Sequence, residues 1–132
     1  SCVAVIIYDT HLHLAGMIHV ALPDSGIDAQ MAKTHPGKFA DRGLPLMIEE
    51  MKALGATRNH IWVKLAGGAS MMDPSAFFDI GKRNVLAIKR VLWKSTLGPV
   101  AEDIGGDSSR TVTMSVGDGT VMLSSGNRSW EL

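Results

Sequence analysis

The chain has 132 residues, of which 45% are hydrophobic and 20% are charged, and its formal net charge is zero. This balance is typical of one globular domain, here residues 1–132, and the lack of net positive charge disfavours a nucleic-acid partner. A single cysteine excludes an intrachain disulfide and a thiolate-rich zinc site. No apolar run approaches the roughly 20 residues that a membrane-spanning helix needs, so we expect no membrane insertion.

The start of the chain lies inside an apolar run and is Ser1 rather than methionine. We therefore expect the natural protein to begin upstream and this domain to lack an N-terminal segment. No charged and then apolar leader is visible, and one cysteine suits a reducing compartment. Together these features favour a cytoplasmic protein.

Two apolar segments open the chain. Residues 2–8 are rich in β-branched side chains, which is typical of a strand buried on both faces. Residues 12–22 read as a second strand that ends at Pro23. The turn-forming residues 9–11 between them predict a β-hairpin.

The middle of the chain alternates between helical and extended patterns. Residues 24–37 are polar and turn-rich, and a loop of this length in a small domain is more often functional than ornamental. Apolar residues then recur at helical spacing in two segments. The predicted elements are a helix over 39–54, a strand over 60–66 running into Gly67-Gly68, a loop containing Asp73-Pro74, and a helix over 80–96 with Asp79 as its N-cap.

The last third of the chain predicts short strands over residues 100–104, 110–116 and 120–124, with a hairpin turn at residues 117–119. The polar tail from Gly126 is expected to be loose. Six or so strands and two helices in mixed order predict an α+β fold, a β-sandwich of mixed sheets flanked by helices.

The hairpin leads to a prediction about chemistry. With Thr10-His11 as the turn, the numbers of opposed residues add up to 21, so Cys2 faces His19. Opposed side chains lie on the same face with Cβ atoms about 4.5–5.5 Å apart. An imidazole at that distance can take the thiol proton and stabilise a nucleophilic thiolate. We therefore expect Cys2 to be the nucleophile and His19 the general base of an amidohydrolase.

An acyl transfer at Cys2 also needs N–H donors for the oxyanion. Backbone amides near the start of the first strand, or in Gly67-Gly68, are the candidates. The residues alone leave a plainer alternative open, because a lone cysteine on a buried strand is usually a small core side chain. A hydrolase of small amides or esters, and an enzyme that uses Ser1 as a terminal nucleophile, are further alternatives.

Metal and phosphate sites are disfavoured. His11 and His13 alternate on the second strand with His19, but zinc needs three or four converging ligands and no suitable thiolate or carboxylate joins them. Gly67-Gly68 and Gly105-Gly106 match no phosphate-binding pattern and indicate tight turns. We predict no metal and no cofactor.

Several short blocks follow one another along nearly the whole chain. They are Ser1-Cys2-Val3, Tyr8-Asp9, residues 15–20 with Leu22-Pro23, residues 38–41, Lys64 with residues 67–71, residues 80–84, and residues 101–106 followed by Arg110. Each block is weak alone, but the ordered series is specific. In this order the blocks resemble the chemoreceptor glutamine deamidase family CheD.

This resemblance implies a protein-glutamine glutaminase. Members of the family convert particular glutamine side chains of methyl-accepting chemotaxis receptors to glutamate. Cys2 matches the family nucleophile and His19 its general base, and Gly67 and Gly68 are expected in substrate binding. The resemblance further implies an α/β sandwich and a CheC-type phosphatase as partner. The alternative is an adaptor that docks this phosphatase or the receptor with little catalysis.

Two departures from the family pattern concern the same site. The family carries a threonine several residues before the cysteine that is thought to orient the histidine, and this chain starts after that position. Ala66 stands where the family usually has an aromatic residue, which predicts a wider pocket wall.

Overall fold

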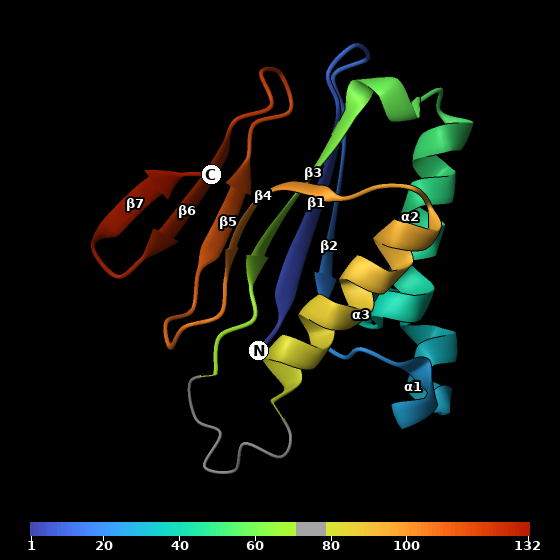
Figure 1. Cartoon of the computed structure of the whole chain (residues 1–132), viewed down its shortest axis with the longest axis vertical. Coiled ribbons are helices and arrows are strands. Elements are labelled where there is room, and N and C mark those ends of the chain that lie inside the picture. The colour runs from blue at the N-terminus through green and yellow to red at the C-terminus, as the bar shows by residue number, and fades with distance from the viewer. Residues whose placement is uncertain (71–78) are drawn as a thin grey trace.

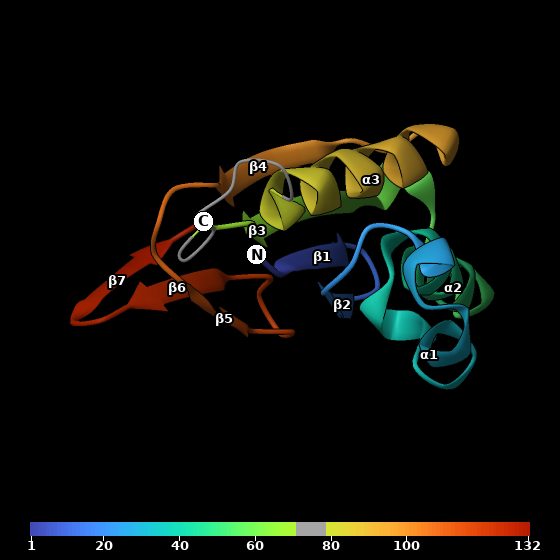
Figure 2. The ribbon, with the colours of Figure 1, turned by 90° about the horizontal axis from the view of Figure 1, so that it is seen from below.

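The computed structural model describes residues 1–70 and 79–132. In that part of the chain, a four-stranded sheet lies between a layer of helices and a three-stranded sheet (Figure 1). Seen along the other axis, the helices and the second sheet lie on opposite sides of the first sheet (Figure 2). The predicted α+β class is confirmed. The loop expected around Asp73-Pro74, and Met71 of the family blocks, lie outside the described residues.

The four-stranded sheet has the order β2-β1-β3-β4. Its strands are β1 (Val3–Asp9), β2 (Leu14–Val20), β3 (Ile61–Gly67) and β4 (Pro99–Ile104). The central strand β1 pairs antiparallel with both β2 and β3, whereas β3 and β4 are parallel. Six of the seven residues of β1 are buried, because this strand has a packed layer on each face, as its β-branched sequence predicts.

The helices cover one face of this sheet. They are α1 (Ala29–Thr34), α2 (Ala40–Ala53) and α3 (Ile80–Lys94), with 3-10 turns η1 (Ser25–Ile27), η2 (Pro36–Lys38) and η3 (Arg58–His60). Alternate residues of β1, namely Val3, Val5 and Ile7, join α2 and α3 in the larger core. Both long predicted helices are confirmed.

The segment predicted as a loop over residues 24–37 holds η1 and α1 instead. Asp28 caps α1 by accepting a hydrogen bond from the N–H of Met31. This helix has only six residues and none of them is buried. It therefore has no apolar periodicity that sequence reasoning could detect.

The second sheet has the order β5-β6-β7, with β5 (Thr111–Met114), β6 (Val121–Ser125) and β7 (Arg128–Glu131) all antiparallel. Val121 and Leu123 pack against Ile6 and Ala66 of the first sheet in a smaller core. The expectation of a loose tail after Gly126 was wrong, because the tail forms β7. Four residues with one half-buried side chain are too short to show an alternating pattern.

The predicted hairpin is confirmed, but its predicted register was wrong by two residues. Asp9 pairs with Leu14 across a loop of residues 10–13, so Ala4, not Cys2, lies opposite His19. The Asp9 carboxylate accepts hydrogen bonds from the N–H groups of His11 and Leu12, which moves the turn toward the second strand. A shift of two residues preserves the face, so Cys2 and His19 remain diagonal neighbours on one side.

Candidate active site

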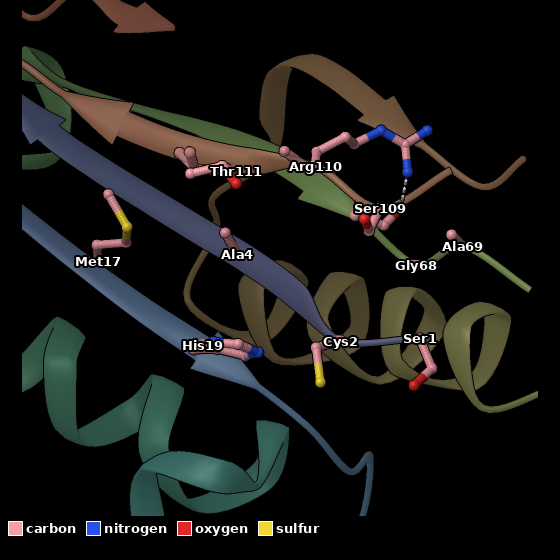
Figure 3. Close-up of a pocket in the computed structure, with 13 residues that line it drawn as sticks. Ser1, Cys2, Ala4, Met17, His19, Gly68, Ala69, Ser109, Arg110 and Thr111 are labelled. Carbon is pink, nitrogen blue, oxygen red and sulfur yellow. Dashed lines mark hydrogen bonds between the residues drawn. The ribbon is translucent and has the colours of Figure 1, made fainter. Parts of the chain in front are cut away.

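A pocket of about 510 Å³ opens where β1 begins, between the two sheets (Figure 3). Four segments of the chain line this pocket. They are Ser1, Cys2 and Ala4 at the start of the chain, Met17 and His19 on β2, residues 66–69 at the end of β3, and residues 109–112 at the start of β5. Among the described residues that line the pocket, none comes from segment 24–37, which we expected to be functional. The pocket is therefore built at the end of the sandwich, where the two sheets diverge.

Cys2 lies at the entrance of β1 with its side chain exposed to solvent. The next residue, Val3, is fully buried against the helices, which fixes the strand from that point. The carbonyl oxygen of Cys2 accepts a hydrogen bond of 2.8 Å from the N–H of Gly68. The thiol is thus accessible, although the backbone that carries it is held in place.

His19 is exposed on β2, while its neighbours Ile18 and Val20 are buried on the helix side. Its cross-strand partner is Ala4, whose small side chain leaves space above the sheet. In Figure 3, the imidazole extends along the sheet toward Cys2. Within residues 1–70 and 79–132, neither the thiol nor the imidazole has a hydrogen-bond partner. Both groups are therefore free to meet a substrate in the same pocket.

Gly67 and Gly68 line the pocket beside Cys2, and their expected part in substrate binding stays a prediction. Both have left-handed backbone angles, with φ of 121° and 74°. A Cβ on Gly67 would overlap the carbonyl oxygen of Cys2. Because the N–H of Gly68 already donates to that oxygen, this turn holds the backbone of Cys2 in place rather than offering the Gly68 N–H as a free donor.

Arg110 is a site residue whose role sequence reasoning missed. Its guanidinium forms an ion pair with Asp103 at 2.9 Å and donates to the carbonyl oxygens of Gly67, at 3.3 Å, and Gly105, at 2.8 Å. The indole N–H of Trp130 donates to the other carboxylate oxygen of Asp103 at 2.8 Å. This network fastens the Gly67 turn to both sheets. Arg110 stood in a family block, but no local pattern indicated its partners.

Asn84 is the second residue that was missed. It lies on the inner face of α3 with no exposed surface, among apolar side chains such as Val85 and Ile88. Its side-chain amide donates to the carbonyl oxygens of Ser1 and Ala21. A polar residue at a helical core position is the sequence signal that could have drawn attention to it.

The chain is an α+β sandwich in which an exposed cysteine and an exposed histidine line one pocket, and a thiol with an imidazole nearby is a pair of groups that thiol-dependent hydrolases use. Residues 21–125 match the family model described as CheD chemotactic sensory transduction. The chain belongs to the CheD family. None of the helices in the described ranges is long and apolar enough to cross a membrane.

Relatives support this assignment over the whole chain. A protein of Syntrophotalea carbinolica is 47% identical over 135 residues, which cover 100% of this chain and 83% of the relative. One of Solibacter usitatus is 44% identical, covering 100% and 78%. One of Methanococcus maripaludis strain C6 is 42% identical, covering 96% and 80%. Each of the three is named a probable chemoreceptor glutamine deamidase CheD.

Proposed function

We propose that this protein is a protein-glutamine deamidase that converts glutamine side chains of methyl-accepting chemotaxis receptors to glutamate. The family assignment and the names of the relatives support this activity. The observation that carries the chemistry is that Cys2, directly before β1, and His19, on the adjacent strand β2, line one pocket. An exposed cysteine beside a histidine has the elements of an activated nucleophile.

The proposed cycle needs only these two side chains and water. His19 takes the proton of the Cys2 thiol, and the thiolate attacks the carbonyl carbon of the glutamine amide. The tetrahedral oxyanion collapses, His19 gives its proton to the departing ammonia, and a thioester remains on Cys2. His19 then takes a proton from water, whose oxygen attacks the thioester. Glutamate is released, and the proton returns to the thiol.

The shape of the pocket suits a side-chain amide presented by a protein surface. Ala4 and Ala66 form a low floor between the strands, and residues 109–112 form the wall on the second sheet. Ala66 is the position at which the family usually has an aromatic residue, so we expect the pocket to be wider at this point. We propose that the receptor segment lies across this opening with the glutamine side chain inserted.

A CheC-type phosphatase is proposed as a partner, and the cytoplasm as the compartment in which both proteins meet the receptor. The family resemblance supports this partner. A binding measurement with the purified phosphatase tests it, since the full-length protein should retain that partner whether or not Cys2 is present. If the protein does not bind the phosphatase, the partner proposal fails while the deamidase proposal stands.

The test of the activity is to incubate the full-length protein with purified receptor and to follow peptide masses for amide-to-acid conversion. We expect conversion by the native protein, its loss in Cys2→Ala and Cys2→Ser, and a roughly 10²–10⁴-fold loss in His19→Ala. His35→Ala is the matched control, because His35 is an exposed histidine outside the pocket.

Two outcomes would contradict the proposal. Conversion that survives Cys2→Ala would exclude Cys2 as the nucleophile. Receptor binding by the native protein without any conversion would favour the adaptor alternative. Free glutamine assayed in parallel separates a protein deamidase from a hydrolase of small amides.

A further inference from the structure

Asn84 joins the two strand ends that carry the site. Its Nδ2 donates to the carbonyl oxygen of Ser1 at 3.0 Å and to that of Ala21 at 3.1 Å. Ser1 directly precedes Cys2, and Ala21 follows His19 by two residues. Both carbonyl oxygens accept from the amide nitrogen of Asn84. Because only the NH₂ group of the side-chain amide is a donor, these two bonds fix the orientation of the side chain.

The burial of Asn84 is energetically unfavourable, which indicates that these two hydrogen bonds have a functional role. Asn84 has no exposed surface, and its Oδ1 finds no hydrogen-bond partner in the described part of the chain. A buried polar atom without a partner destabilises a fold, so such atoms are rare and call for an explanation. The neighbouring core positions of α3 are filled by apolar residues such as Ile88 and Leu92.

The Ser1 carbonyl belongs to the same peptide group as the N–H of Cys2. The described chain contains no cis peptide bonds, and in a planar trans peptide the N–H and C=O point in opposite directions. The bond from Asn84 therefore turns the Cys2 N–H away from α3. In residues 1–70 and 79–132, that N–H donates to no acceptor, although the Cys2 carbonyl is held by Gly68.

We propose that Asn84 is a positioning residue that aims the backbone N–H of Cys2 at the oxyanion formed during attack. The inference rests on the proposed deamidase function. The nucleophile's own N–H is close to the atom that Sγ attacks, and a preorganised donor there stabilises the charge that develops on the amide oxygen. Asn84 sets the direction of this donor without touching the substrate.

The start of α3 packs closely against the turn at Gly68. A Cβ on Gly81, three residues before Asn84, would overlap the carbonyl oxygen of Gly68. The same helix end thus contacts the Gly68 turn and the Ser1 carbonyl. As a result, the peptide groups on both sides of Cys2 are fixed: one by Asn84, and the other by Gly68.

The experiment compares two reactions of the same thiol in the full-length protein. Receptor deamidation passes through an oxyanion, whereas alkylation of Cys2 by iodoacetamide displaces iodide and forms none. For Asn84→Ala and the nearly isosteric Asn84→Asp, we expect kcat for deamidation to fall about 10²–10³-fold with little change in KM. The alkylation rate and its pH dependence should stay within about twofold, as for a reaction that needs no oxyanion donor.

Ile88→Val, on the same face of α3, is the control for general loosening of the helix and should leave both reactions near their native rates. Circular dichroism and thermal unfolding check the fold of every variant. An equal loss of deamidation and alkylation, unchanged deamidation, or loss of folding in both Asn84 variants would assign Asn84 a purely structural role and overturn the inference. A native protein that is alkylated at Cys2 but never deamidates receptor would instead overturn the proposed function.

Discussion

The carbonyl oxygen of Cys2 accepts a hydrogen bond from the N–H of Gly68, and it lies so close to Gly67 that position 67 has no room for a side chain. Gly67→Ala would bring a Cβ into the Cys2 carbonyl at a left-handed φ of 121°. We expect this substitution to lower the free energy of unfolding by about 1–3 kcal/mol and to displace the thiol. Urea unfolding and the alkylation rate of Cys2 measure the two effects.

Gly98→Ala is the matched control for this prediction. In the described part of the chain, a Cβ on Gly98 would meet no heavy atom within 4 Å apart from its chain neighbours, and Gly98 does not have a left-handed φ. Its substitution should change stability by less than about 0.5 kcal/mol. Equal effects at the two glycines would show that the close approach to Cys2 does not constrain position 67.

We expect Arg110 to make the main polar contribution to holding the two sheets together. Its side chain is 10% exposed and donates to the Asp103 carboxylate and to the carbonyl oxygens of Gly67, Gly105 and Ser108, so Arg110→Ala removes a partly buried ion pair and three hydrogen bonds. We expect a loss of about 1–3 kcal/mol in urea unfolding, together with lower deamidase activity as the Gly67 turn loosens. Arg110→Lys should recover little of either, because an ammonium cannot reproduce the fork of donors.

The surface pair of Lys89 and Glu102 provides the comparison for Arg110. Its two side chains are 41% and 29% exposed. Lys89→Ala should therefore cost no more than about 1 kcal/mol. If the Arg110 and Lys89 variants unfolded at the same urea concentration, the Arg110 network would contribute nothing beyond a surface ion pair.

Tyr8 connects the two sheets at the end of the sandwich away from Cys2. Its hydroxyl donates to the carbonyl oxygen of Val116 at 2.7 Å and lies 3.0 Å from Nδ1 of His13. Tyr8→Phe keeps the ring that packs against Gly119 but removes both contacts. We expect a loss of about 1 kcal/mol in thermal or urea unfolding, with no change in the alkylation rate of Cys2. A change in thiol reactivity would contradict the separation of the two ends.

The stability of the fold should depend on pH through Asp9. The backbone N–H of Leu12, followed by those of Thr57 and His11, lowers the pKa of this carboxyl below its ordinary value of 3.8, against the opposing effect of burial. A group whose pKa is lower in the folded state stabilises the fold above its unfolded pKa, and that contribution is lost as the pH falls through the folded pKa.

Asp9→Asn tests this pH dependence. The native protein should be more stable than the variant at neutral pH, and the difference should shrink once the pH falls below about 4. Urea unfolding at neutral pH and at a pH near 3 measures both differences. A difference that is the same at the two pH values would show that the ionised carboxylate is not what stabilises the turn.

Asp9 also explains where sequence reasoning stopped. Two apolar segments joined by turn-forming residues predicted the hairpin. The predicted pairing also placed Cys2 and His19 on one face, which a shift of two residues preserves. The register depends on side-chain hydrogen bonds in the turn, and the bonds from His11 and Leu12 to Asp9 moved it by two residues. The pair is consequently diagonal rather than directly opposed, and its catalytic roles stay a prediction.

The parts of the site that the sequence did not reveal are those that depend on distant contacts. Asn84 reaches Ser1 across 83 positions and Arg110 reaches Gly67 across 43. No periodicity encodes such partners, since they depend on how the layers pack. The two long helices and the central strand were predicted because their patterns are local. The short elements α1 and β7 were not predicted, because each has too few buried residues.

The distribution of the pocket walls along the chain has a consequence for protein synthesis. Cys2 and His19 are synthesised well before residues 109–112, which form the opposite wall and are held by the pairing of β5 with β6. A growing chain therefore carries the exposed cysteine before it carries this wall of the pocket. If the proposed function holds, a chain whose synthesis stops between the two segments has the thiol but cannot select a substrate.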